Sequence, residues 1–493
     1  MTNKKGTMKQ IILIMAHKNR EQIERLVNYF EGKCDIIIHL DKKGSFTKED
    51  ETMLSLLPGV KKVFRKIAVH WAGHSILRCQ LLLLKQGLKL SDGRYFHLIS
   101  GQDYPLKPLD DFLKFFDSEN RDFIQGAHLP APHWDGNTYK RIQHFYFTDW
   151  LNLSGEEEVN KMWRFADLQD KWGIRRRIPD QVKHIFGGST WFTLTRDSAM
   201  KVIEYTDKKP SLLKRFKYTF APDEMYIHTV VRHVNSPEKQ IDCNNQRLVI
   251  WGRAGDNHPI ELSERQMHEI SSTTDFFGRK FNYPTCKPLL HTIDKYLLQK
   301  ENIIRTSTGA WVTRTLTGHR FDKGLSNAIG EFCKINKVKS VIDFGCGIGS
   351  YVIDLRRRNI AAVGYDGNPN TEEFSLLFPE LKDYPCEQLD ITEEIQFEDT
   401  YDMTLCLSVG EYIPSCFEET VWNNLIRSSS KYIIISWGNH DIYDNNIVNP
   451  HSEKEIRRKG ESSGLIVDEL ATHILKKNCW TTKHRQAVIV FSK

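Results

Sequence analysis

Residues 340–350 read SVIDFGCGIGS, and this stretch decides the fold of the C-terminal part of the chain. An apolar run ends at Phe344, glycines follow at 345, 347 and 349, and a helical pattern starts at Ser350. Glycine permits positive φ angles and close approach of a ligand, and a helix start offers free N–H groups. The pattern therefore predicts a strand, a ligand-binding loop and a helix. A dinucleotide fingerprint would need a glycine where Ser350 stands, so the spacing disfavours that ligand.

The neighbouring segments extend this unit into a sheet covered by helices. Two acidic residues follow expected strands: Asp366 could accept both ribose hydroxyls of a nucleoside, and Asp390 could reach an adenine amino group. We expect a Rossmann-like domain with seven strands. Its helices are expected over 321–336 and 350–359, and strands over 340–344, 361–365, 403–407, 432–436 and 487–491.

Four segments, DFGCGIG, GYDGNP, LDIT and LCLSVGEYI, together resemble the class I S-adenosylmethionine-dependent methyltransferases over residues 334–491. The family's LEVLEH-type segment here reads LSVGEY, in which Glu411 is retained while Ser408 and Tyr412 replace the usual acid and imidazole. The resemblance implies that S-adenosylmethionine is the cofactor. The residues it assigns to the cofactor are Asp343, Gly345, Gly347, Gly349, Asp366, Asp390, Ser408 and Glu411.

A methyl transfer to a hydroxyl also needs a base within hydrogen-bond reach. His440, in WGNHD after an expected strand, is the catalytic candidate, and His451 is a weaker one. A loop histidine without a catalytic role is an equally good interpretation of His440. For the whole domain, the competing interpretation is a nucleotide-binding fold that has lost its cofactor.

The N-terminal part shows a second alternation of strand and helix. Residues 11–17 (IILIMAH) and 35–40 (DIIIHL) read as buried strands, with an amphipathic helix over 21–30 between them. A helix over 75–90, a strand over 95–99 and a helix from 222 through His233 continue the pattern. We therefore expect an α/β chain of two domains, 1–300 and 310–493, with the boundary in the mixed stretch 281–317.

The composition excludes several classes of protein. The chain has 493 residues, ten scattered cysteines without a C-x-x-C motif, and a net charge of +6. With 40% hydrophobic residues, the sequence is too apolar for a disordered chain. No stretch approaches the about 20 consecutive apolar residues that a membrane span needs. We expect a cytoplasmic protein with reduced thiols, at most peripheral at the inner face of a membrane. The basic runs 171–177 and 208–217 suit a phosphate-bearing ligand, an anionic membrane or solvent.

The first domain lacks the usual short motifs of hydrolases and NTPases. It has no glycine-rich phosphate loop, no G-x-S-x-G and no H-E-x-x-H. No Asp-x-Asp occurs before residue 300, which is the element that commonly holds a divalent metal against a sugar-nucleotide diphosphate. If this sheet binds a nucleotide sugar, lysine and arginine must neutralise the phosphates.

Seven segments of this domain resemble, in order and approximate spacing, glycosyltransferase family 14, the core-2/I-branching β-1,6-N-acetylglucosaminyltransferases and peptide O-xylosyltransferases. They are HLDKK (39–43), VHWAGHSIL (69–77), HLISGQDYPLKP (97–108), FGGSTWFTLTRD (186–197), APDEMYIHTVV (221–231), NNQRLVIWG (244–252) and FFGRKFN (276–282). The resemblance implies a GT-A-like fold, a UDP-sugar donor, an inverting reaction and no metal.

The resemblance also assigns roles to residues. Glu224 is the general base, and Arg247 with Lys280 neutralises the diphosphate, with Arg279 as the neighbour most easily confused with Lys280. The remaining donor-site residues are His17, Asp41, His70 and Trp71 on the nucleoside side, and Gln102 and Asp103 at the sugar. Without the family context, Glu224 reads as a first-turn acid of a helix. Trp71 and Trp191 read equally well as core residues.

These observations lead to the hypothesis of a bifunctional glycan-modifying enzyme. One half would transfer a GlcNAc-like or xylose-like sugar from a UDP-sugar, and the other would methylate the same or a related glycan. The acceptor would be a glycan or a lipid-linked glycan, and no nucleic acid is expected. One alternative is a C-terminal domain that binds without catalysis. Another is an RNA-modifying methyltransferase, whose basic stretches would hold RNA.

Overall fold

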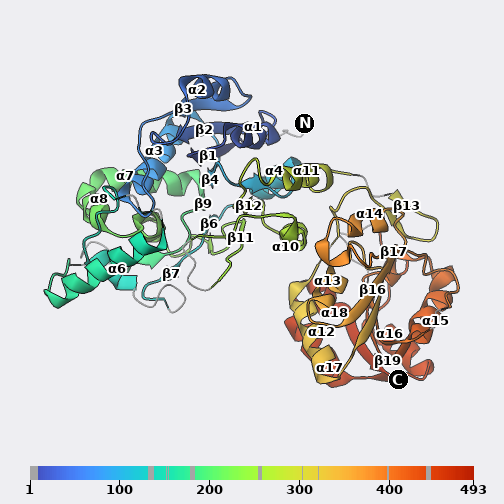
Figure 1. Ribbon diagram of the computed structural model, residues 1–493. Helices are drawn as coiled ribbons and strands as arrows, with labels where there is room; N and C mark the ends of the chain where they lie inside the picture. Colours follow the sequence, from blue (N-terminus) through green and yellow to red (C-terminus); the bar gives the residue numbers. More distant parts are fainter. Residues whose placement is uncertain are drawn as a thin grey trace. The chain divides into compact units, whose positions relative to one another are not determined.

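A computed structural model describes residues 9–493 except 132–137, 152, 154, 178–183, 254–257, 302–303, 320, 397–398 and 440–445. The chain forms two compact units, drawn in Figure 1. The first unit comprises Met1–Leu262 and Thr274–Pro288. The second comprises Leu289–Lys493 together with Ser263–Thr273. In the sequence, this short segment lies between the two parts of the first unit.

The first unit contains a mixed sheet of seven strands. β1 (Gln10–Ala16) runs parallel to β2 (Asp35–Leu40) and β4 (Tyr95–Ser100), whereas β9 (Phe192–Thr195) pairs antiparallel with both β4 and β6 (Asp122–Ile124). The sequence pattern suggested the start of a parallel sheet with alternating strands and helices, and the antiparallel β9 departs from it. The strand order is β10 (Ile241–Asp242), β6 (Asp122–Ile124), β9 (Phe192–Thr195), β4 (Tyr95–Ser100), β1 (Gln10–Ala16), β2 (Asp35–Leu40) and β3 (Val60–Phe64).

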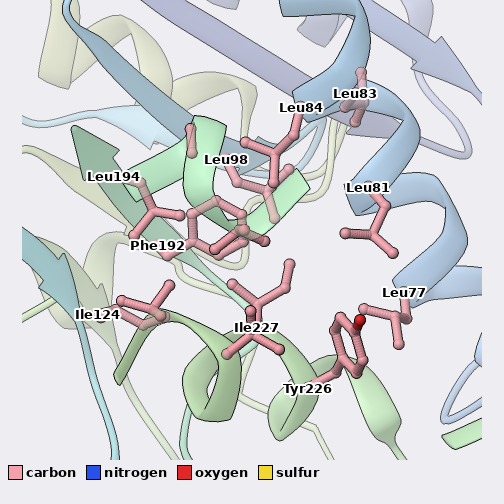
Figure 2. Close-up of a cluster of buried hydrophobic side chains, with 14 of the residues drawn as sticks. Leu77, Leu81, Leu83, Leu84, Leu98, Ile124, Phe192, Leu194, Tyr226 and Ile227 are labelled. Atoms are coloured by element: carbon pink, nitrogen blue, oxygen red, sulfur yellow. The ribbon is translucent and has the colours of Figure 1, made fainter. Parts of the chain in front are cut away.

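Helices cover both faces of this sheet. Side chains alternate along a strand, so Ile11 and Leu13 of β1 face one way and Ile12 and Ile14 the other. The first pair packs in the cluster that includes α3 (His74–Leu90), α7 (Arg196–Lys208) and α9 (Tyr226–Val234). Figure 2 shows part of this cluster, with Leu77 and Leu81 near Tyr226 and with Phe192 beside Leu98. The second pair packs with α1 (Arg20–Tyr29) and α4 (Leu109–Ser118).

Shorter elements complete the first unit. A three-stranded sheet joins segments far apart in sequence, with β12 pairing parallel to β11 and antiparallel to β5. The shorter elements are α2 (Lys48–Ser55), β5 (Tyr104–Pro105), β7 (Ala127–His128), α5 (Thr138–Gln143), α6 (Glu156–Lys171), β8 (Phe186–Gly187), α8 (Pro210–Arg215), β11 (Arg247–Val249) and β12 (Phe277–Arg279).

The second unit contains one sheet of seven strands. Its strands are parallel except β21, which pairs antiparallel with β19 and β20. Apolar residues of β15, β18, β19 and β21 pack with α15 (Glu418–Ser428) and α16 (Glu453–Ser462) to form a hydrophobic core. The strand order is β17 (Glu387–Gln388), β16 (Ala361–Asp366), β15 (Ser340–Phe344), β18 (Tyr401–Leu407), β19 (Ser429–Ser436), β21 (Val488–Ser492) and β20 (Ile466–Val467).

The remaining elements of the second unit lie around this sheet. α12 packs on α17, α13 on β16, and α17 on β21. α11 (Lys287–Tyr296) begins in the first unit and ends in the second. The other elements are α10 (Met267–Ser272), β13 (Ile304–Arg305), β14 (Trp311–Val312), α12 (Lys323–Ile335), α13 (Ser350–Arg356), α14 (Thr371–Ser375), α17 (Glu469–Asn478) and α18 (Thr482–Ala487).

Candidate functional site

The first unit contains a cavity of about 1680 Å³ at the carboxyl ends of its parallel strands. Its wall includes residues that directly follow β1, β2 and β4, which end at the same edge of the sheet. Ligands of open α/β sheets bind at such an edge. The predicted site residues that line the cavity are His17, Asp41, His70, Trp71, Gln102, Glu224, Arg247 and Lys280.

Asp41 joins two loops of the cavity wall. Its Oδ1 accepts hydrogen bonds from the backbone N–H of Lys43 at 2.9 Å and of Val69 at 3.0 Å. The loop after β2 is thereby held to the segment that leads into α3. Burial, followed by the positive charges of Lys18 and Lys280, lowers the pKa of the nearby His17. This imidazole is therefore neutral at pH 7 and can donate or accept a hydrogen bond.

His70 and Trp71 lie in a tight turn immediately before α3. Ala72 has a φ of 55°, and the His70 N–H donates to the Ser75 hydroxyl oxygen at 2.8 Å. The indole of Trp71 meets the ring of Phe220 edge to face, with centroids 5.8 Å apart. Trp71 therefore both packs against neighbouring aromatic residues and forms part of the cavity wall, which combines the two interpretations that its sequence context allowed.

Glu224 presents its carboxylate at the cavity. The side chain is 30% exposed, and its Oε2 accepts a hydrogen bond from Nη1 of Arg141 at 2.9 Å. Arg141 is buried, and its guanidinium lies over the ring of Phe220. A fixed carboxylate at the edge of a cavity can remove a proton from a hydroxyl group that enters it.

The local backbone at Glu224 differs from our expectation of a single helix from 222 through His233. Residues Pro222–Glu224 form one separate turn of 3-10 helix, and α9 begins only at Tyr226. The turn starts after Ala221, which has a φ of 48°, and ends at Met225, which lies outside the helical region. Glu224 is therefore fixed by a short turn rather than by a regular helix.

The adjacent Asp223 has a different environment. It is 3% exposed, and its Oδ2 accepts a hydrogen bond from the hydroxyl of Thr190 at 2.8 Å. Burial raises the pKa of this carboxyl to about 6. Both neighbouring acids contribute to the cavity wall, but Asp223 is buried there whereas the side chain of Glu224 is partly exposed.

Arg247 differs from our expectation that it neutralises a diphosphate. Although it lies in the cavity wall, it is 5% exposed, and its guanidinium donates hydrogen bonds to the backbone carbonyls of Asn245, Leu98 and Phe192 and to the Thr193 hydroxyl. Burial lowers the pKa of Arg247 to about 10. A guanidinium whose Nη groups are engaged in this way holds the sheet and its neighbouring loop together.

Arg279 is better placed for an anion. Its guanidinium lines the cavity 4.2 Å above the ring of Trp191, and its Nη1 has no hydrogen-bond partner among the described residues. Lys280 follows it in the cavity wall, and burial lowers the pKa of both groups. Arg279 and Lys280 therefore place two adjacent cationic side chains in the cavity wall.

Asp103 lies behind the cavity wall rather than at its edge, where we expected it. It is fully buried, and its Oδ2 accepts a hydrogen bond from the Ser100 N–H at 3.0 Å. Its Oδ1 lies 3.7 Å from Nε of Arg279. Asp103 thus supports the guanidinium of Arg279. Gln102 does line the cavity, with its amide donating to the carbonyl of Phe281 at 3.1 Å.

The glycine loop of the second unit follows β15 directly. Gly345, Gly347 and Gly349 have φ values of 73°, 58° and 79°. A Cβ atom at Gly345 would lie 2.2 Å from the side chain of Val409, so no larger residue fits there. These positions require glycine both for the backbone conformation and for the close packing.

Two acids of the second unit lie at the glycine loop. Asp366 accepts hydrogen bonds from the Gly347 N–H at 2.8 Å and from the Asn368 N–H at 2.9 Å. Asp343, at the end of β15, is buried, and its Oδ2 has no hydrogen-bond partner in the described parts of the chain. Burial raises the pKa of Asp343 well above its usual range. The glycine loop and a buried carboxyl oxygen without a partner fit the binding of a nucleoside-containing cofactor.

Asp390 is tied to its own turn. Its Oδ1 accepts hydrogen bonds from the N–H and the hydroxyl of Thr392, at 3.0 and 2.7 Å. It follows β17, the strand next to β16, at the same carboxyl edge of the sheet as Asp366.

Sequence reasoning missed a segment that packs against the glycine loop. A Cβ atom at Gly347 would lie 2.7 Å from Nδ1 of His319, and one at Gly367 would lie 2.5 Å from Ala310. Thr313 accepts hydrogen bonds from the side-chain amide of Asn368. Burial lowers the pKa of His319. No local motif marks residues 310–319, and only their contacts in the folded chain reveal this position.

The segment after β18 contains the remaining predicted cofactor residues. Ser408 has a φ of 58°, and its N–H donates to the Ser436 carbonyl at 3.0 Å. Glu411 is fully buried, and its Oε1 lies 2.8 Å from Nζ of Lys483. Lys483 also donates to the hydroxyl of Tyr412 at 2.7 Å. This acid is thus part of a buried ion pair.

The structure describes only one of the two histidines considered as bases for methyl transfer. His440 lies outside the described residues. His451 pairs through Nε2 with the Glu418 carboxylate at 2.9 Å, and its ring meets Trp437 edge to face. These contacts tie His451 to a structural ion pair.

Among the described residues, no group of three or more His, Cys, Asp or Glu side chains could hold a metal ion. All ten cysteines are free thiols. In the part of the chain that the structure describes, no helix is both long and apolar enough to cross a membrane.

The chain is similar to known transferases. A family profile described as "Core-2/I-Branching enzyme" matches residues 13–274. Xylosyltransferase 1 of Rattus norvegicus is 26% identical over 306 residues, which cover 58% of this chain and 35% of that protein. Xylosyltransferase 1 of Mus musculus is 28% identical over 306 residues, covering 58% of this chain and 30% of that protein. The chain thus spans about a third of the length of the curated relatives it matches.

Solved structures of methyltransferases are also similar to the chain. Magnesium protoporphyrin IX methyltransferase (ChlM) from Synechocystis PCC 6803 with bound SAH is 16% identical, with a TM-score of 0.27, and the match covers 34% of this chain and 80% of that one. The methyltransferase domain of bacterial-CtHen1-CN is 17% identical, with a TM-score of 0.29, and the match covers 35% of this chain and 98% of that one.

Proposed function

Because the chain belongs to the Core-2/I-branching enzyme family, we propose that its first unit transfers a GlcNAc-like or xylose-like sugar from a UDP-sugar to a glycan hydroxyl. The reaction proceeds with inversion and without a metal ion. The observation that carries the proposal is the Glu224 carboxylate, held by Arg141 at the wall of a cavity that also contains Arg279 and Lys280.

Glu224 acts as the general base. It removes the proton of the acceptor hydroxyl while that oxygen attacks the anomeric carbon of the donor from the side opposite the leaving UDP. The hydrogen bond from Arg141 to Oε2 restricts the rotation of the carboxylate and so orients the base toward the cavity. A single base is sufficient for inversion, because the sugar never forms a bond to the protein.

Arg279 and Lys280 stabilise the leaving group. Negative charge accumulates on the β-phosphate of UDP as the glycosidic bond breaks, so cations at this place stabilise the transition state more than the bound donor. Asp103 and Trp191 hold the Arg279 guanidinium in place before the donor arrives. His17, Asp41, His70 and Trp71 form the nucleoside end of the cavity, and Gln102 contacts the donor sugar.

The second unit is a methyltransferase that uses S-adenosylmethionine. The residues that would hold this cofactor are the glycine loop, Asp343, Asp366, Asp390, Ser408 and Glu411. When bound, the cofactor supplies a methyl group on a sulfonium centre. Asp366 would accept hydrogen bonds from the ribose hydroxyls, and the buried Asp343 lies at the start of the loop after β15. The methylated group belongs to the same glycan as the transferred sugar, or to a related one.

The test of the first activity is a mass-spectrometric screen of purified protein against the common UDP-sugars, in the presence of EDTA. We expect hydrolysis or transfer with at least one donor. If turnover requires added magnesium or manganese, the metal-independent assignment is wrong. Calorimetry with S-adenosylmethionine tests the second activity, since absence of binding would contradict it.

One observation favours an alternative for the second unit. The carboxylate of Asp366 is engaged by the N–H of Gly347 and Asn368, and residues 310–319 pack against the same loop. A domain that has lost catalysis and only positions the acceptor would have such a closed loop. In that case glycosyl transfer would continue unchanged without S-adenosylmethionine, and no methylated product would form on addition of the cofactor.

A further inference from the structure

An exposed row of aromatic and aliphatic side chains lies on the first unit outside the cavity. We call it the aromatic ridge and define it as Phe147, Trp150, Phe165, Leu168 and Trp172. Trp150 is 70% exposed, Trp172 is 64% exposed and Leu168 is 41% exposed. Large apolar side chains at such exposure, when they lie next to one another, mark interaction sites.

Ring contacts and helix geometry make the ridge continuous. The rings of Phe147 and Trp150 are stacked, with centroids 5.3 Å apart and an interplanar angle of 12°. Phe147 also contacts Phe165 of α6, with centroids 6.2 Å apart. Residues three and four apart on a helix are neighbours, so Leu168 and Trp172 continue the row from Phe165 to the carboxyl end of α6.

The two basic runs of the sequence come together beside this ridge. The Arg176 guanidinium donates to the backbone carbonyl of Arg215, and Nε of Arg215 donates to the carbonyl of Arg177 at 2.8 Å. Arg176 also lies over the rings of Phe145 and Tyr218, and the ring of Tyr218 contacts Trp150. The exposed basic residues of this surface are Lys171, Arg175, Arg177, Lys214 and Lys217.

The acidic groups close to these cations are few in the described residues. Asp170 accepts from Arg175 and from His144. The other acids of α6 lie mainly in its first turn, Glu156, Glu157 and Glu158, at the end opposite to Trp172. The ridge end of the helix is therefore the positive end of this surface, and it carries both exposed tryptophan and exposed lysine.

The same elements also line the cavity. Leu151 and Leu153 follow Trp150 closely and belong to the cavity wall, and Asn160 and Trp163 of α6 do as well. The described residues that follow Phe147 and those of α6 thus present one side to the cavity and another to the ridge. A molecule held at the ridge would be close to the acceptor side of the cavity.

We propose that the ridge and its basic residues bind the anionic surface of a phospholipid bilayer, so that the first unit acts on a glycan held at a membrane. Indole rings prefer the boundary between headgroups and acyl chains, and lysine and arginine near an anionic leaflet each strengthen binding. The membrane contact follows from the surface itself. The choice of a membrane-held acceptor rests, in addition, on the proposed glycosyl transfer.

Vesicle sedimentation tests the proposal with the full chain. We expect binding to vesicles of phosphatidylcholine mixed with phosphatidylglycerol, weaker binding at high salt, and little binding to phosphatidylcholine alone. Trp150→Ala with Trp172→Ala, and separately Lys214→Glu with Lys217→Glu, should each reduce the bound fraction at limiting lipid about ten-fold or more. Since these four side chains are exposed or at the surface, circular dichroism should be unchanged.

Matched controls come from the second unit. Trp480→Ala removes another tryptophan that is 70% exposed, and Lys334→Glu with Lys337→Glu reverses two exposed lysines at the same spacing as Lys214 and Lys217. Both controls should bind vesicles like the wild type. Equal losses in the control and ridge variants would overturn the proposal, as would wild-type binding by the ridge variants.

Gel filtration without lipid tests whether the ridge joins two copies of the chain instead. If the wild type is dimeric and the ridge variants are monomeric, the ridge is a protein interface and the membrane proposal is wrong. Calorimetry with UDP tests the donor site independently. Vesicle binding without UDP binding would support the membrane contact and contradict the proposed glycosyl transfer. UDP binding without vesicle binding would support the donor site and contradict the membrane contact.

Discussion

Arg141 and Glu224 are 83 positions apart in sequence, and the guanidinium of one donates a hydrogen bond to the carboxylate of the other at 2.9 Å. We predict that Arg141→Ala lowers kcat for glycosyl transfer about ten-fold, because the base loses its fixed orientation, while KM for the donor changes little. Arg141→Lys should recover part of kcat. Lys140→Ala is the control, since Lys140 lines the same cavity but pairs with Asp167. A rise in the donor KM as large as the fall in kcat would argue against a positioning role for Arg141.

Glu224→Gln tests the base itself. The substitution keeps the shape of the side chain and removes its ability to accept a proton, so we expect transfer to fall about 100-fold or more. Calorimetry should show UDP binding at wild-type affinity. Turnover close to that of the wild type would exclude Glu224 as the base.

Arg279 and Arg247 should respond differently to replacement by alanine. Arg279→Ala should weaken UDP binding about ten-fold or more, because a charge-assisted contact to phosphate is lost. Arg247→Ala leaves the carbonyls of Leu98 and Phe192 without these donors and should lower the free energy of unfolding by about 3 kcal/mol. Denaturant unfolding measures the stability of both variants, and calorimetry measures their affinity for UDP. A stable Arg247→Ala variant with the larger loss of UDP affinity would restore our first assignment.

Asp223 should make stability depend on pH. Burial raises its folded-state pKa from the unfolded value of 3.8 to about 6, so between these values the folded chain keeps a proton that the unfolded chain has lost. The contribution of this group to stability therefore falls as pH rises through that window. Relative to the wild type, Asp223→Asn should gain about 2 kcal/mol between about pH 4 and about pH 7. Denaturant unfolding at both pH values measures the difference, and a constant difference would contradict the raised pKa.

Asp366 is the residue of the second unit with the clearest expected effect. Asp366→Ala should weaken S-adenosylmethionine binding about ten-fold or more, because the ribose hydroxyls lose a charged acceptor. Asp383→Ala, at an exposed position of the same unit, serves as the control. UDP binding measured on the same samples should be unchanged. Cofactor binding that is indifferent to Asp366→Ala would remove this residue from the site.

Strands β1, β2 and β4 of the first sheet and β15, β16, β18 and β19 of the second could be predicted from the sequence, because buried strands leave largely apolar runs such as residues 11–15. The antiparallel pairing of β9 with β4 and β6 could not be predicted, since orientation follows from connections far along the chain. The pairing of β11, β12 and β5 was missed for the same reason. Each has only two or three residues, too few for a pattern.

Some residues of the candidate site could likewise be predicted from the sequence, and others could not. Residues directly after strands, such as His17 and Asp41, were predictable because strand ends of a parallel sheet gather at one edge. Arg141 was not, since nothing in its helix marks it as a partner of Glu224. Arg247 and Arg279 carry the same charge in neighbouring strands. Only the folded structure shows that the backbone engages the Nη groups of Arg247, whereas Nη1 of Arg279 has no hydrogen-bond partner among the described residues.

The turn Pro222–Glu224 places two consecutive carboxyl groups in different surroundings. Asp223 is buried and accepts a hydrogen bond from Thr190, whereas the side chain of Glu224 is partly exposed. The register of this turn therefore matters more than its composition. Removing or inserting one residue between Ala221 and Tyr226 would rotate the buried acid outward and the exposed acid inward. Such a chain would keep both acids and still present the wrong one to an incoming hydroxyl, so length variation here should be far less tolerable than substitution in the surrounding loops.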